Sequence, residues 1–160
     1  MFRNAVGIVV FNKDKKVLMC ARKDFAPKNK HWQFPQGGIE PKEAVLDAAK
    51  RELKEETSIS SVRFVASLST PLFYRFPKNI LEKLKNRTPL YEGQKMHWLL
   101  FFFYGKDEEI NIQTQVPEFV DWRWTDIGTA PEKIVYFKKR VYKSVVKKFS
   151  PLISDFIISD

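Results

Sequence analysis

The segment GGIEPKEAVLDAAKRELKEETSI, residues 37–59, decides the fold because it predicts a helix with carboxylates crowded near its end. Pro41 suits the first turn of a helix, and residues 41–57 carry apolar side chains at helical spacing. In such a helix Glu52 and Glu56 lie one turn apart on one face, where their like charges repel by roughly a few tenths of a kcal/mol. A bound cation would offset this repulsion.

The three glutamates of this helix fall at the edge of its apolar face. At about 100° per residue, the apolar stripe consists of Leu46, Ala49 and Leu53. Glu56 has nearly the azimuth of Ala49, and Glu52 and Glu55 lie on either side of it. Carboxylates at the margin of a core are costly unless they are paired, protonated or bound to a metal.

Two interpretations account for this acidic cluster. In the first, the glutamates form a solvated helix face and Arg51 pairs with Glu55 at i, i+4. Glu52 and Glu56 then stay unpaired. In the second, the carboxylates lie beside a glycine turn at 37–38 and hold hard divalent cations, which bind carboxylates together with water and substrate phosphates. The second interpretation predicts a site for phosphoryl chemistry.

The composition is that of a globular protein with a basic surface. The chain has 160 residues, the size of one ordinary domain, and 44% of them are hydrophobic, which excludes a disordered chain. Its apolar runs are too short to cross a bilayer, and its single cysteine, Cys20, excludes an internal disulfide and a cysteine metal cluster. The formal net charge of +9 favours an anionic partner such as nucleic acid or nucleotide. We therefore expect one cytoplasmic domain over residues 1–160 with no membrane partner.

Apolar patterning predicts strands interleaved with two long helices. The predicted strands are residues 5–11, 17–22, 62–68, 98–104 and 118–124. A second amphipathic helix is predicted at 131–149. The prolines and glycines of residues 24–44 predict a long loop without regular structure, and residues 70–94 form a long basic excursion. This order of elements predicts an α/β (α+β) layered domain.

The spacing within the opening segment resembles the Nudix box, the signature of hydrolases that cleave a nucleoside diphosphate linked to another group. The fixed positions, in order, are Gly37, Glu43, Arg51, Glu52, Leu53, Glu55, Glu56, Ser58 and Ile59. Each of them matches except Ser58, where the family usually has glycine. The resemblance implies a Nudix α/β/α sandwich, in which a mixed central sheet lies between helices.

The resemblance also assigns roles within the box. It implies that two or more Mg²⁺ ions, or Mn²⁺ in their place, are held by the carbonyl oxygen of Gly37 and by the catalytic carboxylates of Glu52, Glu55 and Glu56. Glu43 and Arg51 are expected to tie the loop to the helix. At position 58 glycine would relieve a left-handed turn, so serine is expected to cost about 1 kcal/mol.

Beyond the box, the chain resembles the bacterial RNA 5′-pyrophosphohydrolases of this family, a group also described as dinucleoside polyphosphate hydrolases. The matching segments are FRNAVGIVVFN (2–12), WQFPQGGI (32–39), YRFPK (74–78), GQKMHW (93–98), INIQTQVPEFVDWRW (110–124) and FKKRVY (137–142). By this resemblance Glu118 is a further catalytic and metal-binding carboxylate. By the same comparison, residues 24–30 are expected to form a longer loop than is usual in the group.

The same resemblance assigns six substrate-binding residues: Arg3, Lys23, Gln33, Tyr74, Phe137 and Lys138. The first two would meet phosphates, although lysine at position 23 lacks the bidentate fork of the arginine that is usual there. The next two would border the pocket, and the last two would hold a base by stacking and charge. Core packing is the plainer interpretation of Tyr74 and Phe137.

These features predict a Mg²⁺-dependent hydrolase that removes pyrophosphate from the 5′-triphosphate end of RNA, leaves a 5′-monophosphate and so initiates mRNA decay. One alternative is hydrolysis of a dinucleoside polyphosphate, such as diadenosine tetraphosphate, at the same site. Another is an RNA-binding module with a Nudix shape and no activity. The expected partner is an RNA 5′ end or a nucleoside polyphosphate, and a monomer is the default oligomeric state.

Overall fold

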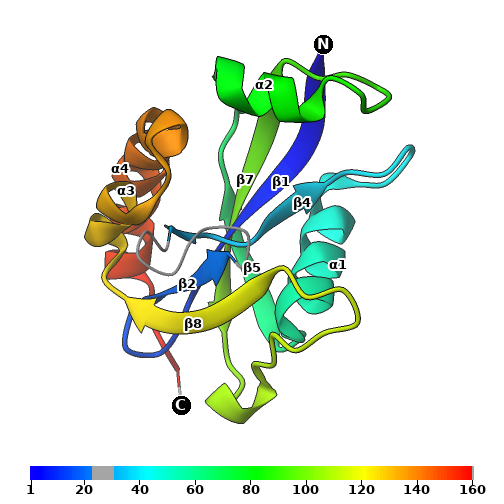
Figure 1. The fold of residues 1–160 in the computed structure, drawn as a ribbon. Helices are drawn as coiled ribbons and strands as arrows, with labels where there is room; N and C mark the ends of the chain where they lie inside the picture. The colour runs from blue at the N-terminus through cyan, green and yellow to red at the C-terminus, as the bar shows by residue number, and fades with distance from the viewer. Residues whose placement is uncertain (23–30, 160) are drawn as a thin grey trace.

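The computed structural model describes residues 1–22 and 31–159, which form a central sheet with helices on both faces (Figure 1). The strands are β1 (Phe2–Phe11), β2 (Val17–Arg22), β3 (Trp32–Gln33), β4 (Gln36–Gly38), β5 (Val62–Ser67), β6 (Leu72–Arg75), β7 (Gly93–Phe103) and β8 (Phe119–Thr125). The helices are α1 (Val45–Thr57), α2 (Lys78–Leu84), α3 (Ala130–Lys133) and α4 (Lys139–Asp155). None of these described helices has the length and apolar character that a membrane span requires.

The sheet is mixed, and helices cover both of its faces. β1 and β7 run parallel from the Phe2–Gly93 pair to the Phe11–Phe102 pair, and the other paired strands are antiparallel. In Figure 1, α1 lies on one face of the sheet, and α3 and α4 lie on the other. This arrangement confirms the predicted α/β/α architecture with a mixed central sheet.

Alternate side chains of β1 supply both halves of the core. Ala5 and Val9 pack in the cluster that includes residues of α4, whereas Val6, Ile8 and Val10 pack in the cluster that includes residues of α1. Successive side chains of a strand point to opposite faces, so a strand covered on both sides is an almost continuous apolar run. The position of β1 at the centre of the sheet therefore explains its sequence.

Helix α1 begins at Val45, four residues later than the sequence predicted. Lys42 has a left-handed backbone with φ 67°, which interrupts any helix that starts at Pro41. The Glu43 carboxylate accepts a hydrogen bond from the Glu40 amide and closes a turn instead. The predicted start of the helix is wrong, and its predicted end is confirmed.

The helix predicted at 131–149 is divided into α3 and α4. Between them Ile134 is extended, with φ −83° and ψ 155°, and the chain turns before it becomes helical again. Ile134 and Val135 are 5% and 8% exposed. Adjacent residues of a helix point about 100° apart, so leaving the helix allows both neighbours to enter the core.

Short strands and a helix replace parts of the predicted loop and excursion. β3 pairs with β2 and β4 pairs with β1, both antiparallel, although Pro35 lies between them. Proline has no backbone N–H to donate, but its carbonyl oxygen can still accept a hydrogen bond. The Pro35 carbonyl oxygen accepts one from the Ile8 amide at 2.9 Å. β6 and α2 lie within the predicted excursion at 70–94. The predicted longer loop at 24–30 falls outside the described residues.

Ser58 ends α1 in the left-handed conformation that the sequence predicted, with φ 67° and ψ 6°. Its amide donates to the Lys54 carbonyl oxygen, and its hydroxyl donates to the Asn111 carbonyl oxygen at 2.8 Å. The hydroxyl bond offsets part of the cost of a left-handed serine.

We expect Ser58→Ala to lower the free energy of unfolding by about 1 kcal/mol, because it removes the bond to Asn111 and keeps the left-handed backbone. Ser58→Gly removes the same bond but relieves the backbone, so it should destabilise less than alanine. Urea denaturation of the three proteins measures the difference. Equal stability of Ser58→Ala and the wild type would show that the hydroxyl bond contributes nothing.

Candidate active site

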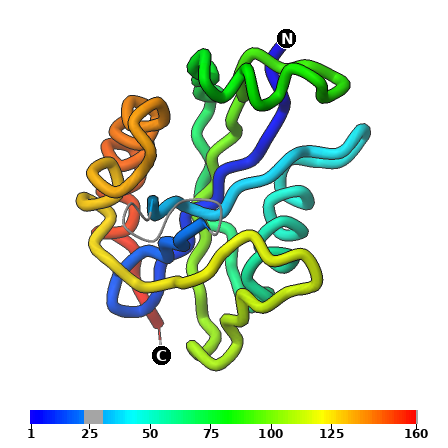
Figure 2. The backbone as a smooth tube through the Cα atoms, viewed as in Figure 1, coloured from blue at the N-terminus to red at the C-terminus, as the bar shows by residue number. Residues whose placement is uncertain are grey.

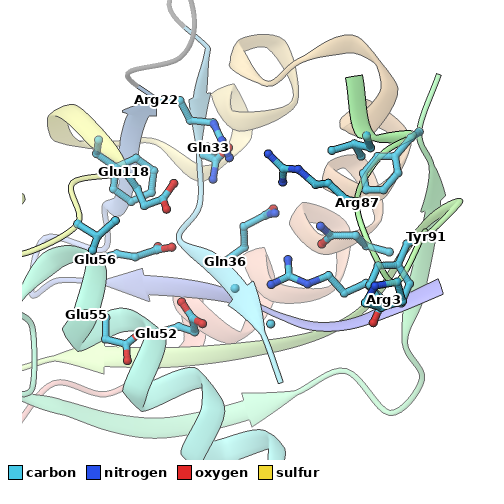
Figure 3. A pocket seen from close by; sticks show the side chains of 18 of the residues that line it. Arg3, Arg22, Gln33, Gln36, Glu52, Glu55, Glu56, Arg87, Tyr91 and Glu118 are labelled. Atoms are coloured by element: carbon cyan, nitrogen blue, oxygen red, sulfur yellow. The ribbon is translucent and has the colours of Figure 1, made fainter. Parts of the chain in front are cut away.

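A cavity of about 1060 Å³ lies between α1, β4, the segment after α2 and the residues that precede β8 (Figure 3). Its acidic lining residues are Glu52, Glu55, Glu56 and Glu118. Its basic lining residues are Arg3, Arg22 and Arg87. In Figure 3 the carboxylates stand on one side, and Arg3 and Arg87 approach from the other. One cavity thus combines groups that bind cations with groups that bind anions.

Two elements bring the carboxylates together. Glu52, Glu55 and Glu56 come from the last turns of α1. Glu118 comes from the residue before β8, and β8 reaches the site because its first residue pairs with Arg22 at the end of β2. The four carboxylates predicted from the sequence therefore line one cavity.

Glu56 has the most strongly perturbed carboxylate of this group. Its Oε2 atom is buried and has no hydrogen-bond partner among the described residues. Burial, with smaller contributions from the Glu52 and Glu118 charges, raises the pKa of Glu56 from 4.5 to about 9. A buried carboxyl in this position is stabilised by a proton or by a cation.

The glycine pair of β4 makes room for two side chains of the site. Neither Gly37 nor Gly38 has a positive φ, so the predicted glycine turn is wrong and both residues lie in a strand. A Cβ atom at Gly37 would overlap the Glu52 carboxylate, and one at Gly38 would overlap the Arg3 guanidinium. Packing against Gly37 buries Glu52, and this burial raises its pKa.

Arg51 ties the segment before α1 to the carboxylates of the helix. Its Nε and Nη2 donate to the two carboxylate oxygens of Glu43 at 2.7 and 2.9 Å, and Nη2 also donates to the Gly38 carbonyl oxygen at 2.8 Å. Its Nη1 donates to Glu52 at 3.0 Å and to Glu55 at 3.2 Å. The predicted tie is confirmed, and the expectation that Glu52 stays unpaired on a solvated face is wrong.

The four carboxylates are groups that bind cations, but they do not converge on one point. Within the described residues, no three His, Cys, Asp or Glu side chains converge closely enough to hold a metal ion. Arg51 binds two of the helix carboxylates, and like charges repel one another. Carboxylate oxygens are nevertheless the ligands that hard divalent cations prefer, and the buried Oε2 of Glu56 lacks a partner in the described part of the chain. The residues present therefore fit such a cation.

Two of the predicted substrate contacts, Arg3 and Gln33, line the cavity. Three others lie behind its described lining. Lys138 is 7% exposed, and its Nζ lies 3.4 Å from Oε1 of Gln36 and over the ring of Tyr74. The ring of Phe137 packs at 5.8 Å from that of Tyr74, as the core-packing interpretation expects. Lys23 falls outside the described residues.

Several cavity residues were not predicted from the sequence: Arg22, Gln36, Arg87, Tyr91 and Gln94. The basic run LEKLKNR at 81–87 was a signal for Arg87, because such a run is typical of a phosphate-facing surface. The others lie in or beside strands, where a polar residue predicts only an exposed or edge position. Strand pairing brings them to the cavity.

The α/β/α fold and this cavity define the class of the protein, which the family comparison identifies. A model of the NUDIX domain matches residues 1–145, and the chain belongs to the Nudix family of hydrolases. Within the family, it is 41% identical over 152 residues to an RNA pyrophosphohydrolase of Pelagibacter ubique, covering 95% of this chain and 94% of the relative. It is also 41% identical over 153 residues to an RNA pyrophosphohydrolase of Zymomonas mobilis, covering 93% and 95%.

Solved structures share the fold at lower sequence identity. A dihydroneopterin triphosphate pyrophosphohydrolase of E. coli superposes with a TM-score of 0.70 at 18% identity, covering 92% of this chain and 99% of that one. An Ap4A hydrolase of C. elegans superposes with a TM-score of 0.69 at 21% identity, covering 96% and 99%. These matches support the fold alone.

Proposed function

We propose that this protein is a divalent-cation-dependent pyrophosphohydrolase that removes pyrophosphate from the 5′-triphosphate end of RNA and leaves a 5′-monophosphate. The single observation that carries the proposal is the cavity in which four carboxylates face arginines. The similarity over nearly the whole chain to RNA pyrophosphohydrolases supports the substrate class. The proposed enzyme is one domain over residues 1–160.

The proposed cation ligands are the Gly37 carbonyl oxygen and the carboxylates of Glu52, Glu55, Glu56 and Glu118. The donor set consists of oxygen atoms, which Mg²⁺ prefers, and we propose that the four carboxylates share two or more ions. When bound, Mg²⁺ neutralises phosphate oxygens and activates water for attack at phosphorus. The buried Oε2 of Glu56 supports this assignment because it has no other partner in the described residues.

The protein's own residues position these ligands and the substrate. Arg51 holds Glu52 and Glu55 from one side, and Gly37 limits Glu52 from the other. On the opposite wall, guanidinium groups neutralise substrate phosphates. Arg3 and Arg87 are the proposed contacts there, and Gln33, which lies near Arg22 in Figure 3, is a further one.

Lys138 is proposed to act through Gln36 and Tyr74, which it contacts from behind the cavity, and Phe137 supports the same group. Lys138 is buried, and Phe137 is half-buried with its ring packed against Tyr74, so direct stacking of a base on Phe137 is a poorer fit than the sequence predicted. Lys23 is retained as a proposed phosphate contact from the family resemblance alone.

A side-by-side assay tests the substrate class. Purified protein with Mg²⁺ should release pyrophosphate from triphosphorylated RNA, and EDTA should stop the release. The kcat/KM on this RNA should exceed that on diadenosine tetraphosphate. Faster turnover of the dinucleotide would assign the site to dinucleoside polyphosphates instead, and no turnover of either substrate would refute the proposed activity.

A further inference from the structure

A second cavity of about 660 Å³ opens beside the first. The two cavities share four lining residues: Arg3, Gly38, Glu52 and Tyr91. The N-terminal end of β1 and the segment after α2, which carry the shared Arg3 and Tyr91, lie together at one end of the molecule (Figure 2). A group bound in the second cavity therefore lies next to a phosphate bound in the first, so both can belong to one ligand.

Among the described residues, the side-chain charges that line the second cavity balance, and the Met1 ammonium group is paired with Glu92. Its lining contains three acidic residues, Glu40, Glu43 and Glu52, and three basic residues, Arg3, Lys42 and Arg51. Glu43 and Glu52 are already paired with Arg51. A balanced, partly paired lining favours an uncharged polar group over another phosphate, because it offers hydrogen bonds without net charge.

Two aromatic side chains line the second cavity, Phe2 and Tyr91. The ring of Phe2 is held by the edge of Phe73, with centroids 5.2 Å apart, and by the Arg75 guanidinium 5.3 Å from its centroid. Tyr91 is placed by the next residue, Glu92, whose amide donates to the Met1 carbonyl oxygen and whose carboxylate accepts from Arg75 at 2.8 Å. The Phe2 ring and the chain at Tyr91 are thus held at the cavity wall before any ligand binds.

We propose that the second cavity binds the nucleobase of the nucleotide directly attached to the polyphosphate, with Tyr91 as the stacking surface. This inference rests on the proposed function and adds a subsite to it. A planar, uncharged, polar base matches the balanced lining, and its stacking on an aromatic face is independent of base identity. The shared Arg3 lies at the junction, where the 5′-phosphate and its nucleoside meet.

The test compares Tyr91→Leu and Tyr91→Phe with the wild type on two triphosphorylated RNAs, one intact and one with an abasic first nucleotide. On intact RNA, Tyr91→Leu should raise KM about tenfold with little change in kcat, because one stacked base is lost. Tyr91→Phe keeps the ring and should behave as the wild type. On the abasic RNA, Tyr91→Leu and the wild type should have equal KM values.

A matched control is Tyr104→Leu, since Tyr104 is 65% exposed and follows β7 at the end opposite Tyr91. It should leave both substrates unaffected. An equal loss for Tyr91→Leu on both RNAs would overturn the proposal by showing that Tyr91 is only structural. An unchanged KM on intact RNA would overturn it as well.

Equilibrium binding keeps the subsite testable if the wild type hydrolyses no RNA and the proposed function fails. Tyr91→Leu should then weaken binding of a non-hydrolysable nucleoside triphosphate about tenfold and leave inorganic tripolyphosphate binding unchanged. Equal changes for the two ligands, or none, would refute the subsite itself.

Discussion

Glu56→Gln is expected to lower kcat/KM on triphosphorylated RNA about 1000-fold, a loss of about 4 kcal/mol of transition-state stabilisation. Glutamine keeps the shape of the side chain but removes the carboxylate charge that the proposed cation needs. The Oε2 atom of Glu56 is buried and has no partner in the described residues, so the cation is the group that would complete its contacts. Pyrophosphate release at saturating Mg²⁺ measures the loss.

The same substitution should preserve the fold of the cation-free protein. The pKa of about 9 means that Glu56 is protonated at neutral pH when no cation is bound, and glutamine mimics this neutral form. The folded protein binds the Glu56 proton more tightly than the unfolded chain does, because the pKa is raised from 4.5. The contribution of this proton to the free energy of unfolding is therefore complete below about pH 4.5 and is lost as the pH rises towards 9. Thermal melts in EDTA should show the wild type losing stability over this interval and Glu56→Gln losing less.

Glu108→Gln is the matched control, because Glu108 is exposed in the short helical turn at Asp107–Glu109 and does not line the cavity. It carries the same chemical change and should retain wild-type activity. Near wild-type activity of Glu56→Gln would remove Glu56 from the proposed ligand set. A parallel loss in both variants would point to a general effect of charge instead.

Gly37→Ala is expected to lower kcat/KM about 100-fold, because the added Cβ atom would occupy the space of the Glu52 carboxylate. The backbone of Gly37 has no positive φ, so alanine adds no conformational strain and the effect is one of space. Displacing Glu52 also disturbs its bond to Arg51. Steady-state assays should show that kcat/KM and the Mg²⁺ concentration at half-maximal rate both change in this variant.

Two other glycines calibrate this effect. A Cβ atom at Gly128 has nothing within 4 Å, so Gly128→Ala should behave as the wild type. At Gly38 the nearest atoms that the added Cβ would meet belong to the flexible end of Arg3, which can move. The kcat/KM of Gly38→Ala should therefore fall between those of Gly37→Ala and Gly128→Ala. If all three variants were equally active, close packing of Glu52 against β4 would have no role in the reaction.

Local sequence patterns predicted the elements that depend on neighbours along the chain. The spacing of apolar residues located α1, and the glycine that the family usually has at position 58 implied the left-handed end of this helix. The apolar run of β1 predicted a strand because a central position requires it to be apolar on both faces. The start of α1 and the break between α3 and α4 were not predicted, since turn closure at Glu43 and burial of Ile134 override helical periodicity.

Within the candidate site, the sequence by itself determined which carboxylates are available and that three of them share one helix end. Glu118 was expected beside them from the family resemblance, and the pairing of β8 with β2 is what brings it there. The tertiary structure alone decided that Arg51 binds Glu52 as well as Glu55, and that Arg87 and Tyr91 face the carboxylates across a cavity. Helical spacing relates residues within a few positions of one another, and this relation can be inferred from sequence. The opposite wall depends on which distant strands pair and in what register, and that is determined by packing of the whole sheet.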